Sequence, residues 1–113
     1  MNSEYPSFQL AEFVPPTGLT GRNCGAPLKA GMTFNRLRRT RFFGDIENLQ
    51  SEDVGETRLI ALTLNRIEAY RTTQVELGPG MTALLEVSGD SLDSIREEIA
   101  RLPGREYLTI ECQ

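Results

Sequence analysis

Short runs of alternating apolar residues, each closed by glycine or proline, recur along this chain and restrict it to small strands joined by turns. Phe8 and Leu10 alternate before the Pro15-Pro16 pair, and Leu108 and Ile110 do so near the end of the chain. A period of two residues places apolar side chains on one face of a strand, and glycine or proline ends it. With 10 glycines and 6 prolines in 113 residues, the chain is predicted to be mostly β.

Seven strands are expected, over residues 7–14, 18–23, 32–43, 56–64, 66–76, 80–88 and 106–112. The apolar face changes between Phe34 and Leu37, which predicts a bulge. The segment from Thr57 to Tyr70 is ambiguous, because its apolar residues fit both a strand and a helix repeat. Nearby threonines favour two strands, interrupted at Asn65-Arg66.

One helix is expected, over about residues 91–102. Leu92, Ile95, Ile99 and Leu102 recur at spacings that place them on one helical stripe, and Pro103-Gly104 ends the helix. The whole pattern predicts a single domain over residues 1–113, a small barrel of six to seven strands with this C-terminal amphipathic helix and a final strand.

The composition argues against catalysis. The sequence contains no histidine, which excludes histidine metal sites and Ser-His-Asp or Cys-His nucleophile systems. Glu97 and Glu98 are adjacent on the predicted helix, so their side chains diverge. Cys24 and Cys112 are expected to be two free thiols, with a disulfide between them as the alternative. We therefore expect no enzymatic activity, no cofactor and no metal.

Charge is distributed unevenly along a chain of net charge −4. Residues 13–44 contain six basic residues and no acid, and an acidic loop over 44–55 follows. The candidate partner-binding residues are Arg36, Arg38, Arg39, Arg41, Asp45, Glu47, Glu52 and Asp53. The arginines are interpreted either as a phosphate-contacting strand or as an exposed edge strand that neutralises the acidic loop.

Two patches resemble the second domain of translational GTPases, the elongation factor Tu domain 2 family. In the first, Thr20-Gly21-Arg22 and a glycine turn lead into Leu28-Lys29-Ala30-Gly31. In the second, Leu77-Gly78-Pro79-Gly80 precedes the apolar strand from Ala83 to Gly89. The resemblance spans roughly residues 7–95 and implies a translation-protein-like β-barrel. No phosphate-binding Gly-x-x-x-x-Gly-Lys-Ser/Thr loop is present, so the GTPase domain itself is not expected.

That resemblance also implies a link to tRNA, because the segment before the Thr-Gly-Arg strand helps elongation factors hold the aminoacylated end of tRNA. Here the corresponding segment, from Glu12 to Thr20, is several residues shorter, although Glu12-Phe13 is similar to the family's acidic–aromatic pair.

The leading functional hypothesis is a non-catalytic binding protein that engages a protein partner through the Arg-rich strand and the acidic loop. An immunity or antitoxin-type inhibitor of a cognate toxin is the alternative, and RNA binding is a further one. No apolar run is long enough to span a membrane and no secretory signal is visible, so a cytoplasmic location without membrane contact is expected. The oligomeric state is left open.

Overall fold

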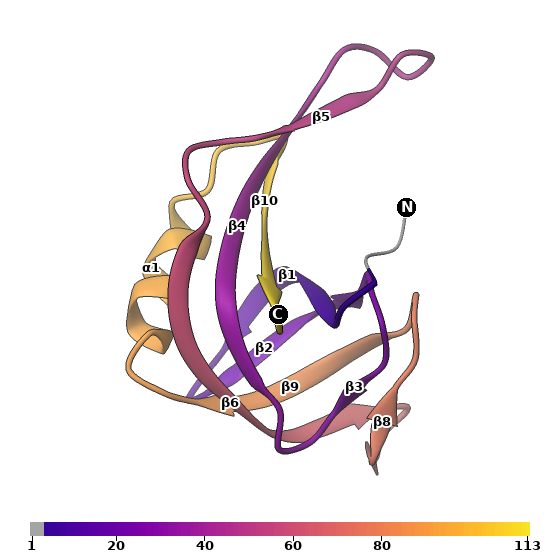
Figure 1. Ribbon diagram of the computed structural model, residues 1–113, viewed down its shortest axis with the longest axis vertical. Coiled ribbons are helices and arrows are strands. Elements are labelled where there is room, and N and C mark those ends of the chain that lie inside the picture. The colour runs from indigo at the N-terminus through magenta and orange to yellow at the C-terminus, as the bar shows by residue number, and fades with distance from the viewer. Residues whose placement is uncertain (1–3) are drawn as a thin grey trace.

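The structure is a computed structural model that describes residues 4–113, and it contains short antiparallel strands and one helix (Figure 1). The elements are β1 (Ser7–Val14), β2 (Gly18–Asn23), β3 (Leu28–Lys29), β4 (Thr33–Phe43), β5 (Gln50–Asp53), β6 (Arg58–Ala69), β7 (Thr72–Gln74), β8 (Glu76–Leu77), β9 (Thr82–Ser88), α1 (Leu92–Ala100) and β10 (Glu106–Glu111). The expected mostly-β class with one helix is confirmed.

Six strands form a ring of hydrogen-bonded pairs. The sheet runs β4, β10, β1, β2, β9, β6, and a further pairing of β6 with β4 closes the circuit. Every pair in the ring is antiparallel. The β4–β6 pairing shifts register between Phe34 and Arg36, at the expected bulge. Strands β5 and β7 extend the sheet at its two margins.

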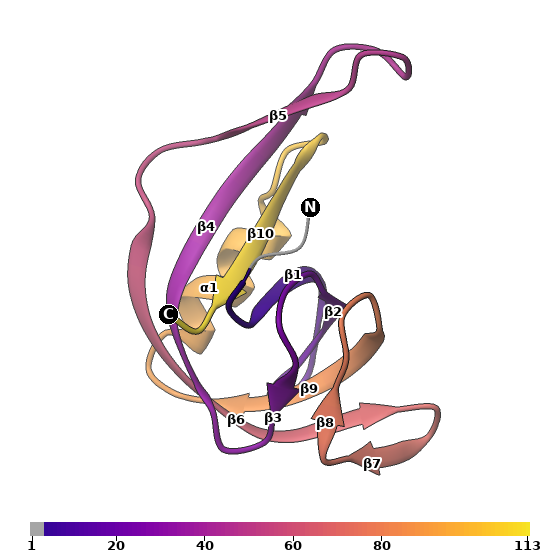
Figure 2. The same ribbon diagram turned by 45° about the vertical axis from the view of Figure 1, so that its right-hand side comes forward.

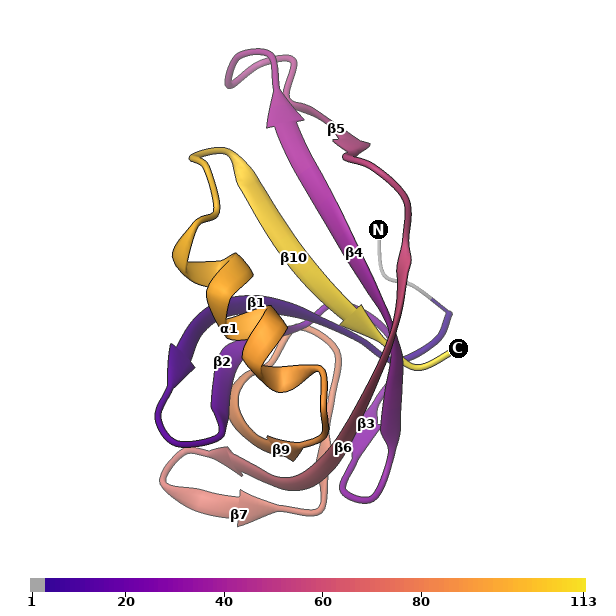
Figure 3. The same cartoon turned by 90° about the vertical axis from the view of Figure 1, so that its left-hand side faces the viewer.

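The inward side chains of the ring form the core, and other elements cover its two openings. Fully buried side chains include Phe8, Phe34 and Ile110. Helix α1 lies over one opening (Figure 3). Its residues Leu92 and Ile95 are buried in the core. On the opposite side, β3 and β8 pair as a separate two-stranded sheet (Figure 2). Its buried residues Leu28 and Leu77 join the same core.

The prediction of two separate strands over 56–64 and 66–76 is wrong. One continuous strand, β6, crosses the expected break, and its pairing with β9 only shifts register between Leu64 and Arg66. Leu62, Leu64 and Ile67 are all buried. Because a bulge inserts one residue without ending the strand, it changes the face on which later apolar residues lie. The chain then turns into the short strands β7 and β8.

The Arg-rich strand is not an edge strand, and the acidic loop is not entirely a loop. Strand β4 pairs with β10 on one side, and with β6 and β5 on the other. The acidic segment folds back as β5, in which Glu52 and Asp53 lie opposite Arg41 and Thr40. Cross-strand pairing of opposite charges stabilises such a ribbon. The resulting β4–β5 hairpin projects from the body of the protein (Figure 1).

Helix α1 is slightly shorter than the expected range. Leu92 and Ile95 are buried, and Ile99 and Leu102 pack against the core, as the apolar stripe predicts. Within residues 4–113, no helix is long and apolar enough to cross a membrane.

Candidate functional site

The four arginines of β4 lie on two opposite faces of the strand. Side chains of a strand alternate between its faces, so Arg36 and Arg38 share one face and Arg39 and Arg41 share the other. Arg38 lines a groove with Thr40, whereas Arg39 lines a shallow hollow beside α1. The structure therefore does not bring the four arginines together into one basic patch.

On the outer face, Arg38 is held by two carboxylates. One guanidinium nitrogen lies 3.5 Å from Glu111, and Arg38 Nε lies 3.8 Å from Asp53. The Glu111 side chain is only 2% exposed, and it also accepts a 3.3 Å hydrogen bond from the Tyr5 hydroxyl. Burial by itself would lower the pKa of Arg38, but Glu111, Tyr5 and Asp53 raise it by more, so the pKa is raised overall.

On the other face, Arg39 connects the sheet to the helix. It donates a 2.6 Å hydrogen bond to Glu106 and lies 3.9 Å from Glu98, which also pairs with Arg58. Glu98 is a residue of α1, so these pairs join β4, β6 and β10 to the helix. The role that the geometry supports for Arg39 is structural.

Two of the predicted acidic residues pair with arginines of β4, and two lie at the end of the hairpin. Glu52 pairs with Arg41 and Asp53 with Arg38. Asp45 accepts hydrogen bonds from the backbone N–H groups of Glu47 and Asn48, at 3.1 and 2.8 Å. Hydrogen bonds of this kind from an aspartate to the following backbone stabilise a turn. The predicted site residues therefore divide between internal ion pairs and the hairpin tip.

Three exposed apolar side chains at the hairpin tip were missed by the sequence reasoning. Phe43 is 38% exposed, Leu49 58% and Ile46 100%. Ile46 lies between Asp45 and Glu47 in the sequence, and Phe43 and Leu49 lie on either side of this segment. Apolar residues inside a turn-rich acidic segment were the signal that could have identified them.

A polar groove of about 370 Å³ lies on the outer face of β2, β1, β10, β4 and β5. It contains two predicted site residues, Arg38 and Asp53. The sequence reasoning did not single out Glu111, because its place in an alternating strand predicts only that it points away from the core. Its burial depends on the neighbouring strands, which carry Tyr5 and Arg38 to it.

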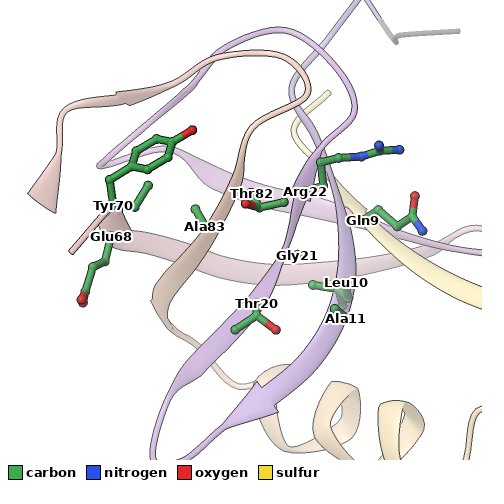
Figure 4. Close-up of a pocket in the computed structure, with 11 residues that line it drawn as sticks. Gln9, Leu10, Ala11, Thr20, Gly21, Arg22, Glu68, Tyr70, Thr82 and Ala83 are labelled. Carbon is green, nitrogen blue, oxygen red and sulfur yellow. The ribbon is translucent and has the colours of Figure 1, made fainter. Parts of the chain in front are cut away.

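A second, more open hollow of about 530 Å³ crosses β1, β2, β9 and the end of β6. Figure 4 shows Tyr70 on one side of this hollow and Arg22 and Gln9 on the other. Glu68, also on its wall, forms a 3.0 Å ion pair with Arg66. The hollow is a surface depression above small residues, and within residues 4–113 it contains no buried charged side chain.

Cys24 and Cys112 are both free thiols, and the sheet keeps them apart. The N–H of Cys24 bonds to Ser7 and that of Cys112 to Pro6, so the two residues follow strands on opposite sides of β1. Strands separated by a third lie roughly 9–10 Å apart. That exceeds the reach of a disulfide, whose Cα atoms lie within about 7 Å. Burial raises the pKa of Cys112 to about 11.

In the part of the chain that the structure describes, no group of three or more histidine, cysteine or carboxylate side chains could hold a metal ion. In comparisons of the sequence, no protein-family model and no curated protein matches it.

Proposed function

We propose that this protein is a non-catalytic binding module that docks onto a basic protein partner through the tip of the β4–β5 hairpin. The observation that carries the proposal is the set of exposed apolar side chains, Phe43, Ile46 and Leu49, on a projecting acidic hairpin. Apolar anchors bury area at the centre of an interface, and surrounding charges steer the approach and select the partner.

The charge of the hairpin supports a basic partner. From Phe42 to Thr57 the chain contains five acidic residues and no basic one. Glu52 and Asp53 are neutralised by arginines of β4, whereas Asp45 and Glu47 lie beside the apolar side chains. The partner that fits this tip carries an apolar hollow rimmed by lysine or arginine.

The ion pairs of β4 argue against the arginines as the main contact. Arg38, Arg39 and Arg41 each have an internal carboxylate partner, so binding a phosphate would break existing pairs. RNA binding is therefore the weaker proposal. Its test is a salt titration of tRNA binding, which should show a steep loss of affinity if phosphates are contacted.

The test of hairpin docking starts with purification of a partner from the source cell lysate, followed by titration calorimetry with that partner. Ile46→Ser combined with Leu49→Ser should weaken binding at least tenfold, which is about 1.4 kcal/mol. Val75→Ser is the matched control, because Val75 is 87% exposed but lies between β7 and β8. If the hairpin variant binds the partner as tightly as the native protein does, or if the control variant loses as much affinity as the hairpin variant, the proposed surface is wrong.

A cognate inhibitor is a narrower form of the same proposal, because a basic toxin would fit the acidic tip. Co-expression of this protein with the gene of the purified partner distinguishes an inhibitor of a toxin from a binding module of another kind. An inhibitor restores growth of cells that express a toxic partner, and Asp45→Lys with Glu47→Lys removes the rescue. A partner that is not toxic to cells excludes the inhibitor form but leaves hairpin docking intact.

We also propose that the six-stranded ring is a barrel similar to the second domain of translational GTPases. Thr20-Gly21-Arg22 lies in β2, and the Leu28-Lys29 segment forms β3, in support of the resemblance. The ring requires β10 between β1 and β4, although β10 lies outside the resembling residues 7–95. A cytoplasmic location is part of this proposal. An experimental structure with a different strand order would contradict the barrel assignment.

A further inference from the structure

The polar groove beside the hairpin has buried polar side chains at its base. Its floor is the outer face of β10, where Thr109 and Glu111 are both buried. Outward side chains of a strand are usually solvated, so the burial of these two shows that side chains of the neighbouring strands cover them. The groove is a half-open polar site whose lining comes from five strands.

One donor at the base of this groove lacks an acceptor. Arg38 Nε is buried and has no hydrogen-bond partner among residues 4–113, and its contact with the Asp53 carboxylate, at 3.8 Å, is too long for a hydrogen bond. The contacts of Glu111 with Arg38 and Tyr5 are also long, at 3.5 and 3.3 Å. Buried polar groups are normally hydrogen-bonded, so this base has capacity for a further oxygen atom.

The formal charges around the groove cancel. Arg22 and Arg38 contribute two positive charges, and Asp53 and Glu111 contribute two negative ones. An anion would meet the two carboxylates and a cation the two guanidinium groups, and each would have unfavourable desolvation to overcome. A neutral ligand that both donates and accepts hydrogen bonds meets neither obstacle.

The remaining wall favours a ligand with hydroxyl groups and an apolar face. The hydroxyls of Ser7, Thr40, Ser51 and Thr109 line the groove. At one end, Phe42 and Tyr107 pack with their ring centroids 4.8 Å apart and tilted by 35°. A sugar ring presents C–H groups on its faces and hydroxyls at its rim, which matches an aromatic wall beside polar side chains.

We propose that this groove binds a neutral polyhydroxylated ligand, such as a monosaccharide unit. A ligand oxygen accepts a hydrogen bond from Arg38 Nε, its hydroxyls donate to Asp53, and its ring packs on Tyr107. A volume of about 370 Å³ lies within the range of small-molecule sites. The groove is separate from the exposed face of the hairpin tip, so this proposal does not depend on the docking proposal.

The test is an NMR titration of the full-length, ¹⁵N-labelled protein. Glucose and N-acetylglucosamine are the neutral probes, and sodium acetate, sodium phosphate and glycine are the charged comparators. Saturating shifts are expected at the amides of Thr40, Ser51 and Thr109 with the neutral probes. At about 10 mM probe, a site with a Kd of 1 mM is about nine-tenths occupied.

Two variants locate the binding. Asp53→Asn and Tyr107→Leu should each weaken binding at least fivefold, while Glu68→Gln, in the other hollow, should leave it unchanged. A thermal melt for each variant verifies that the fold is retained. The proposal is overturned if the groove amides do not move, if only a charged probe moves them, or if both groove variants bind as the native protein does.

Discussion

The guanidinium group of Arg38 lies 3.5 Å from the carboxylate of Glu111, at the base of a groove formed by strands from both ends of the sequence. Glu111 is the last residue of β10, and the Tyr5 hydroxyl that contacts it belongs to the segment before β1. The cluster therefore fastens β10 and the segment before β1 to β4. This relationship makes the outer face of β4 structural as well as a candidate binding surface.

Glu111→Gln should lower the free energy of unfolding by about 2–3 kcal/mol. Removal of one partner of a fully buried pair costs roughly 3–5 kcal/mol, and the effect is smaller here because the Arg38 side chain is 32% exposed. Urea unfolding measures the difference. Arg41→Gln, which breaks the exposed pair with Glu52, is the control and should cost about 1 kcal/mol or less. Equal losses in the two variants would contradict the structural role of Glu111.

Gly21→Ala should destabilise the protein by about 2–3 kcal/mol, since a Cβ at this position would lie 2.0 Å from the backbone oxygen of Gln9 and 2.7 Å from the Phe8 ring. Neither the backbone nor a buried ring can move away without disturbing the β1–β2 pairing. Gly104→Ala, with no atom near the added Cβ, should change stability by less than about 1 kcal/mol. Thermal and urea unfolding of both variants compare them, and an unperturbed Gly21→Ala protein would show that the strands lie farther apart.

Substitutions in the turn between β6 and β7 should increase the stability of the protein. Tyr70 and Arg71 have φ of 54° and 63°, a left-handed conformation that side chains other than glycine and asparagine adopt at a cost. Tyr70→Asn with Arg71→Gly should therefore raise the free energy of unfolding by about 1 kcal/mol. Arg101→Gly is the matched control, because Arg101 has φ of −104°, and it should give no gain. A loss of stability in the turn variant would show that the Tyr70 or Arg71 side chain makes contacts worth more than the strain.

Cys112 should make stability fall at high pH. Its pKa in the folded protein is raised from 9.0 to about 11 by burial, so the unfolded chain loses this proton first. The stabilisation is complete below pH 9 and is lost as the pH rises towards 11. Cys112→Ser should show a shallower fall between pH 9 and 11 in urea unfolding. Identical slopes for the two proteins would indicate that the thiol is not buried in solution.

The sequence predicted the strands and the helix well where the apolar pattern and the flanking glycine or proline residues indicate the same boundaries. β1, β2, β9, α1 and β10 lie at or within two residues of their expected ranges, because alternating apolar residues and flanking glycine or proline both mark them. The prediction that the strand is interrupted at Asn65-Arg66 was wrong. In a sequence, a β-bulge and the end of a strand produce the same change in which residues face the core. Strand β5 was not predicted, because its segment is acidic and has no alternating apolar residues. It pairs with β4 through oppositely charged side chains across the two strands.

The candidate site was less predictable. The four arginines of β4 are close together in the sequence, which suggests one basic patch. The alternation of side chains along the strand divides them between its two faces: Arg36, Arg38, Arg39 and Arg41. Their partners come from residues that are distant in the sequence, such as Glu98 and Glu111. The exposure of Ile46 and Leu49 depends on where the hairpin projects, which no local pattern specifies.

The amino-acid sequence alone determined that this chain is built from short strands and one amphipathic helix, because backbone conformation and apolar periodicity are properties of neighbouring residues. The tertiary structure decided which strands close the ring, which charges neutralise one another, and which apolar side chains stay exposed on the hairpin. Those outcomes depend on contacts between distant segments, whose geometry exists only when the sheet has formed.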